Sequence, residues 1–206
     1  MSHYFDPDPS VPSQPGQVTL AVGALTLELT TDRGVFARHA VDPGPRFLLL
    51  EAPAPPPQGD LVDLGCGYGP FALALARRSP RATVWAVDVN RRALALTAAN
   101  ARANGADNVR AVPAEDVPPE LRFAGIWTNP PVRIGKAALQ ALLSYWLERL
   151  APDGRAWLVM HKHLGADSLA RWLADQGFAC ERLRSRRGYR LLEVRARTGP
   201  SPAPVP

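Results

Sequence analysis

The chain has few of the residues that form disulfides or bind metal ions. Only two of its 206 residues are cysteine, Cys66 and Cys180, and they form neither a disulfide framework nor a zinc-binding spacing. His161 and His163 alternate in a strand-like segment, but no cysteine or carboxylate residue directly adjoins them. We therefore expect no metal centre and no disulfides.

Long apolar segments are also absent. No run approaches the roughly 20 apolar residues of a membrane span, and the N-terminus lacks the basic-then-apolar pattern of a signal peptide. We therefore expect a cytoplasmic protein with no membrane partner. A hydrophobic content of 46% and a length of 206 residues predict a single globular domain with a substantial core.

Acidic residues are fewer than basic residues. Nineteen aspartates and glutamates against 24 lysines and arginines give a formal net charge of +5. A basic balance of this kind suits a nucleic-acid partner. It would also follow from a composition that favours arginine throughout the chain, so charge alone leaves both interpretations open.

Strand-like and helix-like segments alternate from residue 59 onward. This alternation predicts a Rossmann-like α/β fold, a doubly wound and mostly parallel sheet of seven strands, closed by an antiparallel pair at 178–183 and 189–194. Before it, the polar–apolar alternation over 17–31 predicts a β-hairpin, and a short helix follows at 43–50. The other strands are expected at 61–64, 83–88, 109–112, 123–128 and 155–161, and the helices at 70–78, 91–104, 136–150 and 166–176.

These segments predict three parts of the chain. Residues 1–58 are expected to be an irregular N-terminus with the hairpin and short helix packed on the core. Residues 59–197 form the main α/β domain. Residues 198–206 are rich in proline without apolar periodicity and predict a disordered tail.

The most informative local feature is the segment DLGCGYG, from Asp63 to Gly69, which follows a short apolar run. Its glycines, Gly65, Gly67 and Gly69, allow a sharp turn and let the backbone approach a ligand closely. A dinucleotide-binding turn would have its last glycine one position later, where this chain has Pro70. The turn therefore favours a nucleoside cofactor without phosphates over a nicotinamide dinucleotide.

Carboxylates at neighbouring strand ends complete the predicted cofactor site. Asp63 can receive the ammonium of an amino-acid moiety, and Asp88, at the end of the next strand, can accept both hydroxyls of a ribose. Glu115 and Asp116 follow the third strand and could reach an adenine amino group. The other residues predicted to contact the cofactor are Cys66, Val89, Asn90 and Asn129.

A second motif, Thr128-Asn129-Pro130-Pro131, follows the fourth strand. An amine conjugated to a π-system is a poor nucleophile until it is oriented and its N–H bonds are polarised. The amide oxygen of Asn129 and the carbonyl of Pro130 can each accept one N–H, and the consecutive prolines stiffen the loop. We therefore predict Asn129, Pro130 and Pro131 as catalytic residues for methyl transfer to a planar amino group.

With these motifs the chain resembles the small-domain group of class I S-adenosylmethionine-dependent methyltransferases, and within it the bacterial 16S ribosomal RNA guanine-N2 methyltransferases. The resemblance implies S-adenosylmethionine as cofactor and places Phe36, Arg133 and Lys136 at the mouth of the substrate site. An aromatic residue after the second proline is common among adenine and glutamine methyltransferases, whereas this chain has Val132. The resemblance covers about 30–194 and is carried by 34–36, 41–44, 63–69, 87–90 and 128–136.

The sequence therefore predicts a monomeric or homodimeric enzyme that acts on RNA, namely ribosomal RNA or the small ribosomal subunit. Arginines between 182 and 190 could bind RNA or could form a solvated edge. Methylation of a protein glutamine or of an RNA adenine remains an alternative. A catalytically silent, cofactor-binding assembly factor is a further one, which the intact Asn129-Pro130-Pro131 disfavours.

Overall fold

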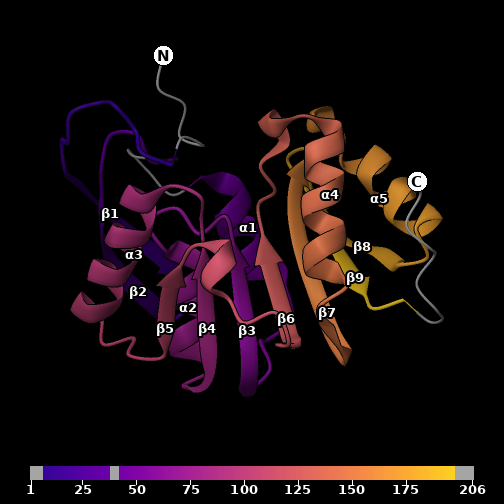
Figure 1. Cartoon of the computed structure of the whole chain (residues 1–206), viewed down its shortest axis with the longest axis horizontal. Helices are drawn as coiled ribbons and strands as arrows, with labels where there is room; N and C mark the ends of the chain where they lie inside the picture. The colour runs from indigo at the N-terminus through magenta and orange to yellow at the C-terminus, as the bar shows by residue number, and fades with distance from the viewer. Residues whose placement is uncertain (1–6, 38–41, 198–206) are drawn as a thin grey trace.

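The computed structural model describes residues 7–37 and 42–197, and its centre is a seven-stranded sheet (Figure 1). The strand order is β5-β4-β3-β6-β7-β9-β8, in which the first five strands run parallel and β9 lies antiparallel to both neighbours. This confirms the predicted fold class, including the antiparallel closing pair. The strands are β3 (Gln58–Leu64), β4 (Arg81–Val87), β5 (Val109–Val112), β6 (Phe123–Thr128), β7 (Leu150–His161), β8 (Ala179–Arg186) and β9 (Tyr189–Arg195).

Helices cover both faces of the sheet because successive strand residues point to opposite sides. Leu61 packs in a core with α1, α2 and α3, whereas Val62 packs in a second core with α4 and α5. Both cores are built from buried aliphatic and aromatic side chains. The helices are α1 (Pro43–Glu51), α2 (Pro70–Arg78), α3 (Arg91–Ala103), α4 (Lys136–Leu147) and α5 (Ala166–Asp175).

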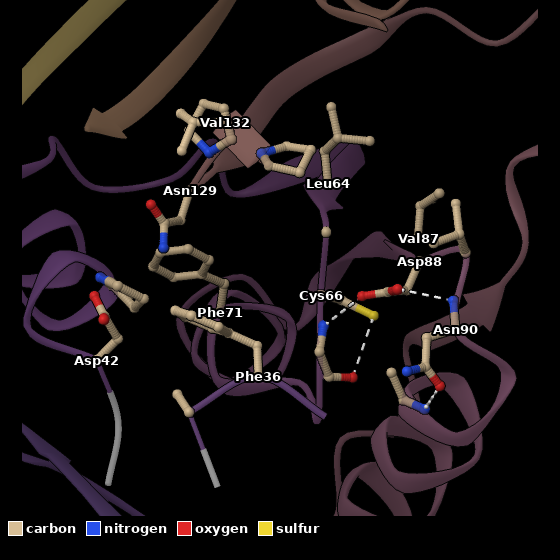
Figure 2. A pocket seen from close by; sticks show the side chains of 18 of the residues that line it. Phe36, Asp42, Leu64, Cys66, Phe71, Val87, Asp88, Asn90, Asn129 and Val132 are labelled. Carbon is tan, nitrogen blue, oxygen red and sulfur yellow. Dashed lines mark hydrogen bonds between the residues drawn. The ribbon is translucent and has the colours of Figure 1, made fainter. Parts of the chain in front are cut away.

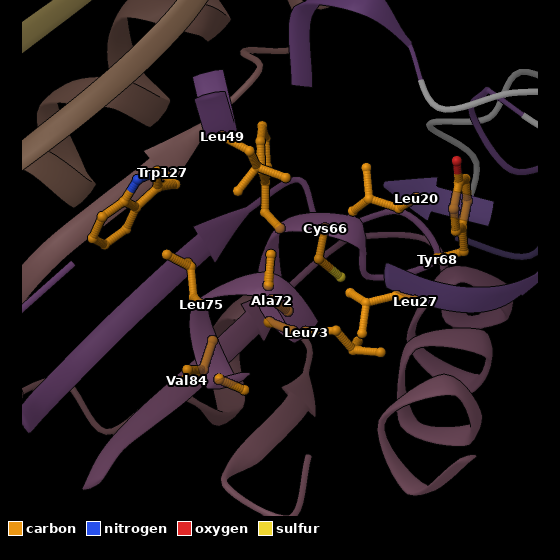
Figure 3. Packing of buried hydrophobic residues seen from close by; sticks show 14 of the residues in the cluster. Leu20, Leu27, Leu49, Cys66, Tyr68, Ala72, Leu73, Leu75, Val84 and Trp127 are labelled. Atoms are coloured by element: carbon orange, nitrogen blue, oxygen red, sulfur yellow. The ribbon is translucent and has the colours of Figure 1, made fainter. Parts of the chain in front are cut away.

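The N-terminal hairpin of β1 (Gly16–Val22) and β2 (Leu25–Thr31) packs against α2 and α3. Its apolar face contributes Leu20 and Leu27 to the first core (Figure 3). The buried side chain of Asn100, on α3, bonds to both backbone groups of Thr30 and to the carbonyl of Tyr68, each at 2.8 Å. One amide therefore joins the hairpin to the glycine turn.

Replacing Asn100 with alanine should lower the free energy of unfolding by roughly 2–4 kcal/mol, because three buried backbone groups lose their partner. Asn104→Ala is the matched control, because Asn104 bonds to the carbonyl of Glu28 at an exposed position, and we expect a change of about 0.5 kcal/mol. Urea denaturation measures both values. Equal effects of the two variants would contradict the bridging role of Asn100.

The prediction of a helix over 136–150 was wrong at its C-terminal end. α4 stops at Leu147, and Leu150 begins β7, five residues before the predicted strand start. Leu150 pairs with Phe123, and a register irregularity between Phe123 and Gly125 interrupts the pairing of β6 with β7. A buried leucine fits a helical and a strand pattern equally well, which explains the error.

Other strand boundaries also differ from the prediction. β3 begins at Gln58, β4 ends at Val87 rather than at Asp88, and β8 extends to Arg186. Gln58 and Arg186 are polar, so the apolar pattern did not reveal these two strand ends. Three short 3-10 helices, at Ala114–Asp116, Val132–Ile134 and Lys162–Leu164, were not predicted. The tail predicted at 198–206 lies outside the described residues.

Candidate active site

A cavity of about 510 Å³ opens at the carboxyl ends of the parallel strands (Figure 2). Its wall includes the glycine turn at 64–68, the segment after β4 at 87–90 and the segment after β6 at 129–134. Ligands of doubly wound sheets bind at this edge. The two motifs that the sequence singled out therefore share one cavity.

The sheet topology holds these motifs together. β3 lies between β4 and β6, so that Leu64 is paired with Val87 on one side and with Thr128 on the other. The hydroxyl of Thr128 donates to the carbonyl oxygen of Leu64 at 2.8 Å, in a buried position. This hydrogen bond joins the end of β3, just before Gly65, to the end of β6, just before Asn129.

The three glycines of the turn have positive φ angles of 80°, 56° and 94°. A Cβ atom added to Gly65 or Gly67 would meet no atom within 4 Å, so both glycines border open space. A Cβ on Gly69 would lie 2.8 Å from Leu73 and 3.0 Å from Thr97. The first two glycines therefore keep the cavity open, and the third permits close packing of the turn against α2 and α3.

Amide groups of the turn already donate within the protein. The N–H groups of Gly65 and Cys66 donate to the carbonyl of Val87, at 2.8 and 3.0 Å. The N–H of Gly67 donates to the carboxylate of Asp88 at 2.9 Å. A pyrophosphate bound at a glycine turn relies on free backbone N–H groups. The observed bonding therefore favours a ligand without phosphates.

Asp88 lies on the cavity wall directly after β4 (Figure 2). Its two carboxylate oxygens accept from the backbone N–H groups of Gly67 and Asn90, each at 2.9 Å. Burial raises the pKa of Asp88, and these hydrogen bonds oppose the shift. A carboxylate has about four acceptor positions, so this fixed group retains capacity for the two hydroxyls of a ribose.

Asn90 supports the wall of this part of the cavity. Its side chain is buried, accepts from the N–H of Ala93 at the start of α3, and donates to the carbonyl of Gly34 at 2.8 Å. The second bond ties the segment that carries Phe36 to the helix. Val89 lies beside it on the wall with 56% of its surface exposed.

Asp63 is fully buried and is not among the residues that line the cavity. One carboxylate oxygen accepts from the N–H of Ala72 at 2.9 Å, and the other has no partner. Burial and the nearby charge of Asp88 raise the pKa of Asp63 to about 8. An unpaired buried oxygen next to the glycine turn fits a site that receives a positively charged group, and direct contact with a cofactor remains a prediction.

The titration of Asp63 gives a testable pH dependence. Its pKa is about 8 in the folded protein, against 3.8 for an ordinary aspartate, so between these values the folded state holds a proton that the unfolded chain releases. The stability that this bound proton gives to the folded state is therefore lost as pH rises towards and through 8. We expect the free energy of unfolding of the ligand-free protein to fall by roughly a few kcal/mol between pH 5 and 9.

Asp63→Asn should remove the larger part of this fall, because an amide does not ionise. Asp107→Asn, at an exposed loop position, is the control and should follow the wild type. Urea denaturation at pH 5, 7 and 9 measures the difference. If Asp63→Asn shows the wild-type dependence, the raised pKa is wrong.

The segment after β6 forms the other side of the cavity. Asn129 is half-buried, and its amide points into the cavity towards the ring of Phe71 (Figure 2). The carbonyl of Pro130 accepts from the N–H of Val132 at 2.8 Å, which leaves one lone pair for a ligand. Pro131, Val132 and the predicted mouth residues Phe36 and Arg133 are also on the wall.

Several residues predicted for the site lie away from this wall. Glu115 and Asp116 are exposed on a 3-10 helix, from which only the preceding Ala114 reaches the cavity. Lys136 is exposed at the start of α4, and Gly69 lies behind the turn. Their roles in binding remain predictions. The wall also contains residues that sequence reasoning missed, including Asp42, Phe71, His161 and Tyr189.

Neither metal ligands nor membrane spans were found in the described residues. No group of three or more histidine, cysteine, aspartate or glutamate side chains could hold a metal ion there. Within the same residues, no helix has the length and apolarity to cross a bilayer.

Comparisons with known proteins agree with this geometry. The family model of the methyltransferase small domain matches residues 26–193. The chain belongs to this family. An uncharacterized relative, protein YbxB of Bacillus subtilis, is 33% identical to this chain over 196 residues, which are 94% of this chain and 98% of the relative.

Ribosomal RNA methyltransferases are also similar to this chain. The ribosomal RNA small subunit methyltransferase C of Ectopseudomonas mendocina is 34% identical, over 92% of this chain and 56% of its own length. The solved structure of the Thermus thermophilus 16S rRNA N2 G1207 methyltransferase, in complex with AdoMet and guanosine, has a TM-score of 0.76 at 28% identity, over 92% of this chain and 52% of that one. The chain thus spans about half the length of these relatives.

These findings confirm the predicted family and fold. They also confirm the predicted cofactor at the level of the family, whose members use S-adenosylmethionine. The family is a finding about the whole matched region, whereas the role of each site residue is an inference from its position.

Proposed function

We propose that this protein transfers a methyl group from S-adenosylmethionine to the N2 amino group of a guanine in the RNA of the small ribosomal subunit. The observation that carries this proposal is the placement of Asn129 and Pro130 on the wall of the cavity that also contains the glycine turn and Asp88. When bound beside Asp88, the cofactor supplies an electrophilic methyl group.

The chain's own groups act mainly by positioning the amine. The amide oxygen of Asn129 and the remaining lone pair of the Pro130 carbonyl accept its two N–H bonds, which directs the nitrogen lone pair away from the ring plane. Both acceptors gain strength as positive charge develops on nitrogen in the transition state. The cationic product loses a proton readily, so that the step requires no strong base.

The proposed substrate is supported by the relatives whose names specify the small ribosomal subunit. We propose that the matched domain itself contributes to the RNA-binding surface. Two exposed arginines lie next to the cavity residue Tyr189, namely Arg186 at the end of β8 and Arg187 in the turn that follows. Neither makes an ion pair with any described residue. By contrast, Arg182 and Arg190 both lie 3.6 Å from Asp167.

Binding to RNA should therefore weaken with salt, and reversing the charges of Arg186 and Arg187 to glutamate should flatten that dependence. Each lost phosphate contact removes about 0.7–0.9 from the slope of log affinity against log salt concentration. The matched control reverses Arg81 and Arg122, which are exposed at the opposite edge of the sheet. Binding that is independent of salt would indicate that the basic balance is compositional.

The reaction is tested by incubating the purified protein with labelled S-adenosylmethionine and 16S ribosomal RNA, either free or in small subunits from a strain that lacks the gene. Nucleoside analysis should identify N2-methylguanosine. N6-methyladenosine, or label in a protein glutamine, would replace the proposed substrate by one of its alternatives. Cofactor binding without any transfer would favour a silent module.

A further inference from the structure

A carboxylate lies at the target end of the cavity, and it belongs neither to the glycine turn nor to the Asn129-Pro130-Pro131 motif. Asp42 directly precedes α1 and lines the cavity with Asn129 and Phe36. Figure 2 shows Asp42 and Asn129 on the same side of the cavity, with Phe36 and Phe71 between them and the Cys66–Asp88 side. The cavity therefore has one carboxylate at each end, and only Asp88 is placed for the cofactor.

The Asp42 carboxylate is held by its surroundings. One oxygen accepts from the N–H of Gly44 at 2.8 Å and caps α1. A Cβ on Gly44 would lie 3.0 Å from that oxygen and 2.9 Å from the ring of Tyr189, so both groups pack against this glycine. Burial and the charge of Asp42 raise the pKa of Tyr189, which keeps its phenol protonated as a donor towards Asp42.

A fixed carboxylate matches only some of the bases that carry an amino group. It accepts hydrogen bonds and donates none. Guanine presents N1–H and N2–H as adjacent donors, whereas the N1 of adenine, next to its amino group, is an acceptor. The amide of glutamine likewise places a carbonyl oxygen beside its NH₂ group. A carboxylate that faces the atom beside the amino group therefore favours guanine and repels adenine and glutamine.

We propose that Asp42 accepts the N1–H of the target guanine while Asn129 and Pro130 hold its N2 amine. This inference rests on the proposed function and names the residue that selects the base. A site built around a buried hydrogen-bond acceptor rejects analogues that lack the matching donor, because its own polar group is then left unpaired.

The decisive probe is 2-aminopurine, which keeps the 2-amino group but has no hydrogen on N1. A short RNA that contains the mapped target is made with guanine or with 2-aminopurine at that position. For the wild type, kcat/KM should be roughly 10- to 100-fold lower on 2-aminopurine. Asp42→Asn keeps an acceptor for Gly44 but turns an NH₂ group towards the base, so its preference for guanine should disappear or reverse.

Asp42→Ser, which can also cap α1, should likewise lose the preference, and Asp107→Asn should keep it. Affinity for S-adenosylmethionine, measured in parallel, should stay at the wild-type level in all three variants. Equal wild-type rates on the two bases, or an unchanged preference in Asp42→Asn, would overturn the role of Asp42 and leave the proposed function intact. If the wild type methylates an adenine or a glutamine instead of guanine, both proposals fail.

Discussion

Replacing Asn129 with alanine should lower the rate of methyl transfer roughly 10²–10³-fold, as observed when one preorganised polar group is removed from an active site. Asn129 follows β6, whose end is tied to the glycine turn by the bond from Thr128 to Leu64. Its amide is directed into the cavity rather than into the protein core (Figure 2). The fold and the affinity for S-adenosylmethionine should therefore be close to those of the wild type.

Single-turnover transfer to RNA at saturating cofactor isolates this effect, because it excludes product release. Asn129→Asp should also be slow, since it keeps an acceptor but adds a charge whose desolvation is costly. Asn104→Ala, at the far end of α3, is the matched control and should transfer at the wild-type rate. Near-wild-type transfer by Asn129→Ala would refute the amine-holding role and favour a silent module.

Replacing Asp88 with alanine should raise the dissociation constant of S-adenosylmethionine roughly 30- to 1,000-fold, or about 2–4 kcal/mol, because charge-assisted hydrogen bonds to both ribose hydroxyls are lost. Isothermal titration calorimetry measures this loss directly. Asp88 also accepts from Gly67 and Asn90, so the alanine variant could alter the turn itself.

Asp88→Asn removes the negative charge but keeps one acceptor oxygen, so that it preserves one of the two backbone hydrogen bonds. Its affinity should lie between those of the wild type and the alanine variant. Asp107→Ala removes an exposed carboxylate elsewhere and should bind like the wild type. Unchanged affinity in Asp88→Ala would exclude the ribose role.

The fold and the meeting of the two motifs could be predicted from the sequence because both depend on local patterns. Alternating strands and helices imply a parallel sheet, and parallel strands end at a common edge. The Asp63–Gly69 segment and the segment that begins at Thr128 each follow a strand, so their meeting at one edge needed no knowledge of tertiary contacts. The structure adds the bond from Thr128 to Leu64 that fixes their spacing.

Residues brought in by packing could not be predicted in this way. Asp42 and Tyr189 come from opposite ends of the domain and meet only because α1 packs against β9. Residues 41–44 contributed to the family resemblance, but no role at the cavity was predicted for Asp42 or Tyr189. The proposed recognition of a target base would therefore depend on contacts between elements that no single segment of the sequence reveals.

Side-chain direction was the other missing information. Asp63 lies near the end of β3, as predicted, but its carboxylate turns towards the N-terminus of α2 and is buried there. Glu115 and Asp116 follow β5, as predicted, but a 3-10 turn leaves them exposed. A pattern of apolar residues locates the end of a strand more reliably than it gives the direction of the next side chain.

The most direct test of the central claim is mass-spectrometric mapping of modified nucleosides in the ribosomal RNA of a strain that lacks this gene. We predict that N2-methylguanosine disappears from one position of 16S ribosomal RNA. The wild-type gene should restore it, and the Asn129→Ala gene should not. An unchanged set of N2-methylguanosines in the deletion strain would contradict the proposed function.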